Sequence, residues 1–146
     1  MPRMTVTRTI DAPVDLVFNS VADISQFSQA IPHIVNVEFL TEQKTGVGTR
    51  FREMRLMHGK EATTELEVTE YVENERIRLV ADSHGILWDT VFTVKSEDGP
   101  TELTMTMDAK ACKLLSRIMN PLIMGMITRA VEKDMDAVKD FCENEH

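Results

Sequence analysis

The sequence predicts an α+β fold in which a curved antiparallel sheet of about seven strands wraps around one long C-terminal helix. Three observations predict it. Seven short stretches between residues 5 and 109 are rich in strand-forming residues or alternate apolar and polar side chains. Two short helical patterns lie between the first and second of these stretches. Residues 113–143 then repeat apolar side chains about every 3.6 positions, which at 1.5 Å per residue gives a helix of roughly 45 Å.

The chain begins with a strand and two short helices. Residues 5–10 (TVTRTI) are rich in β-branched side chains and predict the first strand. The following Asp11-Ala12-Pro13 offers an aspartate as N-cap and a proline in the first turn of a helix over 14–21. A second short helix starts after Asp23 and ends at Ile31-Pro32, because the residue before a proline is pushed out of the helical region.

Six further strands follow, separated by turn sequences of which SEDGP at 96–100 is the clearest. Each of the later strands has one apolar and one polar face, which is typical of an antiparallel sheet covered on one side. The long helix is then the element that covers the apolar face. The predicted strands are 34–40, 49–57, 62–69, 77–81, 86–94 and 101–109.

Length and charge limit the function. A chain of 146 residues with 42% hydrophobic residues predicts one domain, residues 1–146, with a substantial core. The net charge of −8 argues against a nucleic-acid partner, because phosphate contacts need clustered positive charge. No apolar run is long enough for an integral membrane segment, and no signal peptide is visible, so we expect a cytoplasmic protein.

The two halves of the predicted long helix differ. Residues 114–127 are apolar on nearly every side and are interrupted by Pro121 and Gly125, which predicts a kink, or two segments that meet, near Asn120-Pro121. This apolar first half is expected to be a mobile lid. Residues 130–142 are amphipathic and are expected to clamp the sheet. The charged residues between 132 and 143 are expected to form the solvated face of that half.

Four stretches, taken together and in order, carry a family resemblance: RTIDAPVDLVFNSVADI, GVGTRFREMR, DGPTELTMTM and EKDMDAVKDFCE. With them the chain resembles the helix-grip superfamily of START-related and Bet v 1-like proteins (SRPBCC), in particular its polyketide cyclase/dehydrase and lipid-transport group. The resemblance implies an elongated cavity between sheet and long helix that holds apolar small molecules. It implies no fixed set of catalytic residues. We expect no cofactor.

Candidate ligand contacts follow from the faces of the predicted strands and helices. Glu53 and Arg55 share the alternation face of Phe51, so all three point into the cavity unless a bulge reverses the strand. The methionines and Trp88 suit either an adaptable pocket wall or ordinary core packing. The predicted ligand-binding residues are Phe27, Ile31, Phe51, Glu53, Arg55, Trp88, Thr90, Phe92, Met105, Met107, Leu115, Met119, Leu122 and Met126.

Few residues offer other chemistry. Glu53 beside Arg55 is the best catalytic candidate, as an acid/base or as a group that orients a ligand hydroxyl or carbonyl; the alternative is a structural ion pair. No two histidines have helical metal-ligand spacing and no HExxH is present, so we expect no metal.

Two main functions remain open. The first is binding or transport of an apolar small molecule, such as a lipid, an isoprenoid or an aromatic polyketide-like compound. The alternative is a polyketide cyclase or dehydratase that uses Glu53. A protein-interaction module is a second alternative, and the sequence leaves open a monomer or a homodimer.

Overall fold

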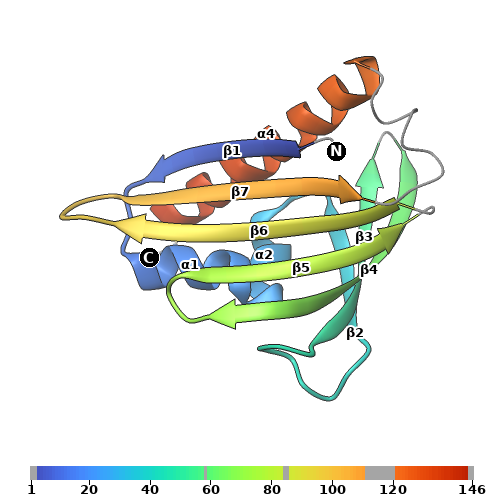
Figure 1. The fold of residues 1–146 in the computed structure, drawn as a ribbon, viewed down its shortest axis with the longest axis horizontal. Helices are drawn as coiled ribbons and strands as arrows, with labels where there is room; N and C mark the ends of the chain where they lie inside the picture. Colours follow the sequence, from blue (N-terminus) through green and yellow to red (C-terminus); the bar gives the residue numbers. More distant parts are fainter. Residues whose placement is uncertain (1–2, 58, 84–85, 111–120, 145–146) are drawn as a thin grey trace.

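A computed structural model describes residues 3–57, 59–83, 86–110 and 121–144. It contains a seven-stranded antiparallel sheet with the order β1-β7-β6-β5-β4-β3-β2 (Figure 1). Neighbours in sequence are neighbours in the sheet from β2 to β7, and β1 pairs with β7 at the far edge. The strands are β1 (Arg3–Ile10), β2 (Ile34–Phe39), β3 (Arg50–Met57), β4 (Lys60–Val72), β5 (Arg76–Ser83), β6 (Ile86–Ser96) and β7 (Thr101–Lys110).

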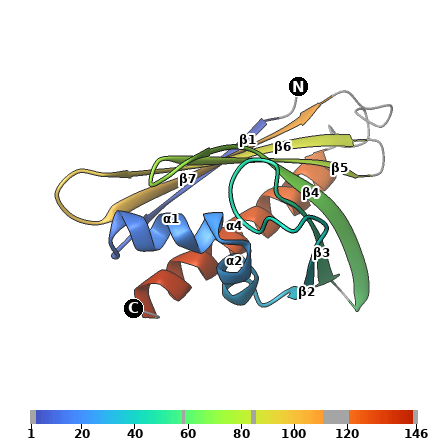
Figure 2. The same ribbon diagram turned by 90° about the horizontal axis from the view of Figure 1, so that it is seen from below.

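Three helices lie against the concave face of the sheet: α1 (Val14–Ala22), α2 (Ile24–Ala30) and α4 (Pro121–Asn144) (Figure 2). The sheet curls around them, with β2, β3 and β4 bending down past the side of α4 (Figure 2). The predicted α+β, helix-grip arrangement is therefore confirmed. None of the helices in the described part of the chain is long and apolar enough to cross a membrane.

The two short helices meet at Asp23. Its carboxylate accepts hydrogen bonds from the backbone N–H groups of Ser25 and Gln26, at 3.0 and 3.4 Å, and so caps α2. The prediction that Asp11 caps α1 is wrong. The N-cap is Pro13 and makes no side-chain cap bond. Asp11 instead donates its backbone N–H to the Glu143 carboxylate of α4 at 2.9 Å.

The C-terminal helix α4 is described over Pro121–Asn144 and continues through Gly125. The residues before Pro121 lie outside the described part of the chain, so the kink and the lid stay predictions. The second half of α4 is bonded to β1. Arg8 Nε lies 2.6 Å from Asp136 Oδ1, and Lys139 Nζ donates to the Thr9 carbonyl oxygen at 2.7 Å.

The core fills the space between the helices and the concave face. Its fully buried side chains include Phe18 of α1, Ile77 of β5 and Leu103 of β7. A bulge in β4 between Val68 and Glu70 shifts the alternation by one residue. Tyr71 can then pack edge-to-face on Phe18, with ring centroids 5.4 Å apart.

Candidate ligand-binding cavity

A cavity of about 340 Å³ lies between the concave face of the sheet, α2 and α4. Its described walls come from all strands except β1 and from the three helices, and most of the lining side chains are apolar. A small number of polar groups among many apolar ones is typical of small-molecule sites. The polar members of the described lining are Ser28, Glu53, Arg55, Thr64, Thr90 and Asp134.

The sheet wall is built by alternation along the strands. Every second residue of β6 and β7 faces the cavity: Trp88, Thr90 and Phe92, then Met105 and Met107. Phe92 packs edge-to-face on Phe27 of α2, with ring centroids 6.0 Å apart, so α2 closes one side. Trp88 also packs against the small buried cluster of Ile86 and Ala109, and its indole therefore serves both wall and core.

One stripe of α4 forms the opposite wall. The residues of α4 that face the cavity recur every three or four positions, as expected for one face of a helix. Leu122 and Met126 lie off this stripe and are exposed, by 78% and 58% respectively. The cavity-facing residues of α4 are Ile127, Ala130, Val131, Asp134, Met135 and Val138.

Three charged side chains meet at the cavity wall. Arg55 Nε donates to Glu53 Oε1 at 2.5 Å on the same face of β3. Arg55 Nη1 donates to Asp134 Oδ2 of α4 at 2.8 Å. The side chains of Glu53, Asp134 and Arg55 are 10%, 18% and 21% exposed, so the cluster is largely shielded from water. It joins the sheet to the long helix through side chains that also line the cavity.

The guanidinium of Arg55, at the centre of this cluster, stays charged. Burial disfavours the charged form of Arg55, but the carboxylates of Glu53 and Asp134 outweigh it and raise the pKa of the guanidinium. One cation between two carboxylates leaves a formal charge of −1. Each carboxylate bonds Arg55 through one oxygen, and the other oxygens, Glu53 Oε2 and Asp134 Oδ1, have no hydrogen-bond partner among the described residues.

The structure brings together nine of the residues predicted as ligand contacts: Phe27, Phe51, Glu53, Arg55, Trp88, Thr90, Phe92, Met105 and Met107. Their role as ligand contacts remains a prediction. Ile31 does not line the cavity; it is 1% exposed in the core and ends α2. Leu122 and Met126 face outward because of their place on the helix. Leu115 and Met119 lie outside the described residues.

Asp134 is the functional candidate that the sequence interpretation missed. It was predicted on the solvated face of the helix together with the other charges after residue 132. In the structure it lies three positions after Val131 and four after Ala130, on the apolar stripe itself. A carboxylate on the apolar stripe of a helix needs a buried cation as its partner. This requirement is the signal by which the sequence could have shown Asp134 to be a candidate.

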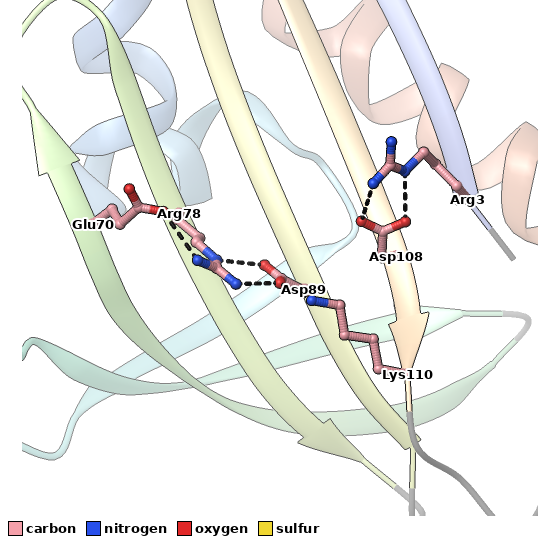
Figure 3. A network of polar contacts seen from close by, with 6 residues as sticks. All are labelled: Arg3, Glu70, Arg78, Asp89, Asp108 and Lys110. Atoms are coloured by element: carbon pink, nitrogen blue, oxygen red, sulfur yellow. Dashed lines mark hydrogen bonds and ion pairs between the residues drawn. The ribbon is translucent and has the colours of Figure 1, made fainter. Parts of the chain in front are cut away.

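A second group of charges lies on the outer face of the sheet (Figure 3). Asp89 of β6 is 6% exposed and binds Arg78 of β5 through two hydrogen bonds, at 2.5 and 2.8 Å, and Lys110 of β7 at 2.8 Å. The hydrogen bonds from Arg78, and then that from Lys110, outweigh burial and lower the pKa of Asp89 to about 2. Glu70 also accepts from Arg78, at 3.1 Å. We call these residues, with Arg3 and Asp108, the outer ion network.

Among the described residues, no group of three or more His, Cys, Asp or Glu side chains is placed to hold a metal ion.

The fold and the cavity define a helix-grip protein. Residues 1–143 match the family described as polyketide cyclase / dehydrase and lipid transport, and the chain belongs to this family. No curated protein matches the chain.

Solved structures share the fold at low sequence identity. A START superfamily protein from Mycobacterium smegmatis superimposes with a TM-score of 0.80 at 15% identity, over 99% of both chains. Ara h 8.0201 gives 0.75 at 11% identity over 97% of both chains. The di-domain ARO/CYC BexL from the BE-7585A biosynthetic pathway gives 0.75 at 17% identity, over 99% of this chain and 51% of BexL. At these identities the likeness concerns the fold.

Proposed function

We propose that this protein binds and carries an apolar small molecule in the cavity between the sheet and α4. The observation that carries the proposal is the cavity itself: about 340 Å³ inside the fold, with a mostly apolar lining and a few convergent polar groups. A void of this size in a core forfeits packing contacts, so a fold that keeps one has a reason to leave the space.

The volume narrows the class of ligand. The volume lies at the lower end of the range usual for small-molecule pockets, roughly 300–1,000 Å³. This favours a compact ring system or a single short chain over a whole two-chain lipid. Burying about 200 Å² of apolar ligand surface would contribute about 5 kcal/mol to affinity before the costs of association.

A pair of neighbouring substitutions on β5 tests the proposal. Ala81 faces the cavity and is buried, whereas Val80 is on the outer face of the same strand. Nile red, a neutral dye whose fluorescence rises in apolar surroundings, reports occupancy. We expect Ala81→Phe to fill the cavity and abolish dye binding, while Val80→Phe binds as wild type does. Equal binding by both variants would place the dye elsewhere and count against the cavity.

Glu53 supports a second candidate function, a cyclase or dehydratase. It is a buried carboxylate that faces the cavity, and its Oε2 has no hydrogen-bond partner among the described residues. Such a group can move a proton during aldol-type ring closure and loss of water. With a linear polyketide-like substrate, Glu53→Gln should abolish turnover and keep dye binding. Unchanged turnover would exclude Glu53 as the acid/base.

A further inference from the structure

We propose that the cavity selects ligands whose polar end donates hydrogen bonds, such as an alcohol, a phenol or an amine, and rejects those that end in a carboxylate or phosphate. This inference rests on the proposed binding function and names the chemical class of its ligand. The polar groups of the cavity wall carry the argument.

The first step is the charge balance. Glu53, Arg55 and Asp134 line the cavity and together hold a formal charge of −1. Their side chains are mostly buried, so water screens this charge poorly. A ligand anion that entered would meet two carboxylates around one guanidinium. The arrangement is the reverse of an anion site, in which the arginine has no carboxylate partner.

The second step is the count of acceptors. Glu53 Oε2 and Asp134 Oδ1 have no hydrogen-bond partner among the described residues, and an ionised carboxylate oxygen can only accept. Neither oxygen is among the fully buried side-chain atoms that lack a partner. A ligand donor in the cavity can bond such an acceptor, whereas a ligand anion offers it no hydrogen. The donor can be a hydroxyl, which leaves the charge at −1, or an ammonium, which neutralises it.

The third step concerns the neighbouring hydroxyls. Thr64 of β4 is paired with Glu53 across the sheet, and Thr90 and Ser28 also line the cavity. Ser28 Oγ already donates to the Ser25 carbonyl oxygen at 2.8 Å, so it can only accept from a ligand. The two threonine hydroxyls can donate or accept. They add polarity without adding positive charge. Arg55 is therefore the one guanidinium or ammonium group in the described lining, and two carboxylates already bond it.

A matched set of ligands with one chain length tests the proposal. Decanol, decylamine and decanoate have chains that suit the cavity and differ in the head group. Displacement of Nile red at pH 7.4 measures each dissociation constant. We expect decanol and decylamine to bind at least about tenfold more tightly than decanoate. Decanoate binding as tightly as decanol would overturn the head-group inference and leave the cavity proposal intact.

Two charge-matched variants assign the cause. Glu53→Gln removes one negative charge from the cavity while Asp134 still pairs Arg55, and it should reduce the preference for decanol over decanoate by about fivefold or more. Glu65→Gln removes the same charge from the outer face of the sheet and should leave the preference unchanged. Equal preferences in wild type and Glu53→Gln would overturn the role of the cluster. If none of the three ligands displaces dye from wild type, the binding proposal fails together with this inference.

Discussion

Asp89 of β6 lies directly opposite Asp108 of β7 on the outer face of the sheet, and each carboxylate is bonded to a cation from a neighbouring strand. Like charges in directly opposed positions destabilise a sheet. Here Arg78 and Lys110 bond Asp89, while Arg3 of β1 bonds Asp108 at 2.8 and 3.2 Å. The outer ion network therefore turns a repulsive pair into links among β4, β5, β6, β7 and the edge strand β1 (Figure 3).

Asp89→Asn tests the strength of this network. Asp89 has a pKa of about 2 in the folded protein and about 3.8 as a reference, so its charge stabilises the fold above pH 3.8, and this contribution is lost as the pH falls toward 2. The shift corresponds to at most about 2 kcal/mol, and less after solvent screening at the sheet surface. We expect Asp89→Asn to be less stable than wild type in urea at pH 7, and the difference to shrink at pH 2 to 3.

Glu65→Gln is the control on the same face. Glu65 bonds Arg52, but both side chains are well exposed, at 51% and 39%. Its substitution should change stability by less than about 1 kcal/mol at any of these pH values. A loss for Asp89→Asn that is independent of pH would show that its charge is not the source.

Arg55→Met tests the joint between β3 and α4. The variant leaves two mostly buried carboxylates without a cation, which should cost about 2 to 4 kcal/mol in urea unfolding. Arg52→Met, on the exposed face of the same strand, should cost less than about 1 kcal/mol. The triple variant E53Q/R55M/D134N removes the unpaired charges and should recover most of the loss. A triple variant as unstable as Arg55→Met would show that packing of the arginine stem, and not charge, holds the joint.

Two methionines of α4 offer a test of its orientation. Met135 is 1% exposed and lines the cavity, whereas Met126 is 58% exposed. Met135→Ala should destabilise the protein by about 2 to 5 kcal/mol in thermal or urea unfolding and enlarge the cavity, so longer alkyl ligands should gain affinity relative to decanol. Met126→Ala should change neither stability nor ligand length. Similar effects of both would contradict the observed face.

Asp23→Ala removes the cap of α2. Two backbone N–H groups at the helix start then lose their acceptor, at a cost of about 1 kcal/mol in unfolding free energy. Asp23→Asn keeps an acceptor oxygen and should cost clearly less. Since Phe27 of α2 lines the cavity, dye affinity should also fall in the alanine variant. An alanine variant as stable as wild type would mean that tertiary contacts hold α2.

The faces of the strands could be predicted because alternation has a period of two. Phe51 is apolar and had to face the core, which placed Glu53 and Arg55 on the same side, and the structure shows this arrangement. The end of α2 at Ile31 was predictable from Pro32 for an equally local reason. These features depend on neighbours within a few residues.

The rest depends on how distant segments meet. Leu122 and Met126 are exposed while the neighbouring Ile127 lines the cavity, and periodicity in so short an apolar run could not show which of them face outward. Asp134 looked like one more surface charge until Arg55, from a strand far away in sequence, supplied its partner. The outer ion network could not be predicted from the sequence either, because it depends on the strand register that places Asp89 opposite Asp108.

Alternation has one further consequence for this sheet. The cavity wall and the outer ion network are carried by the same strands, yet by interleaved residues: Trp88 and Thr90 on one side, Asp89 between them on the other. The cavity-facing side chains of β6 can therefore be exchanged without altering the ion pairs of Asp89 on the outer face. A library of variants restricted to positions such as 79, 81, 88, 90, 105 and 107 would change the lining of the cavity while the outer ion network stays the same.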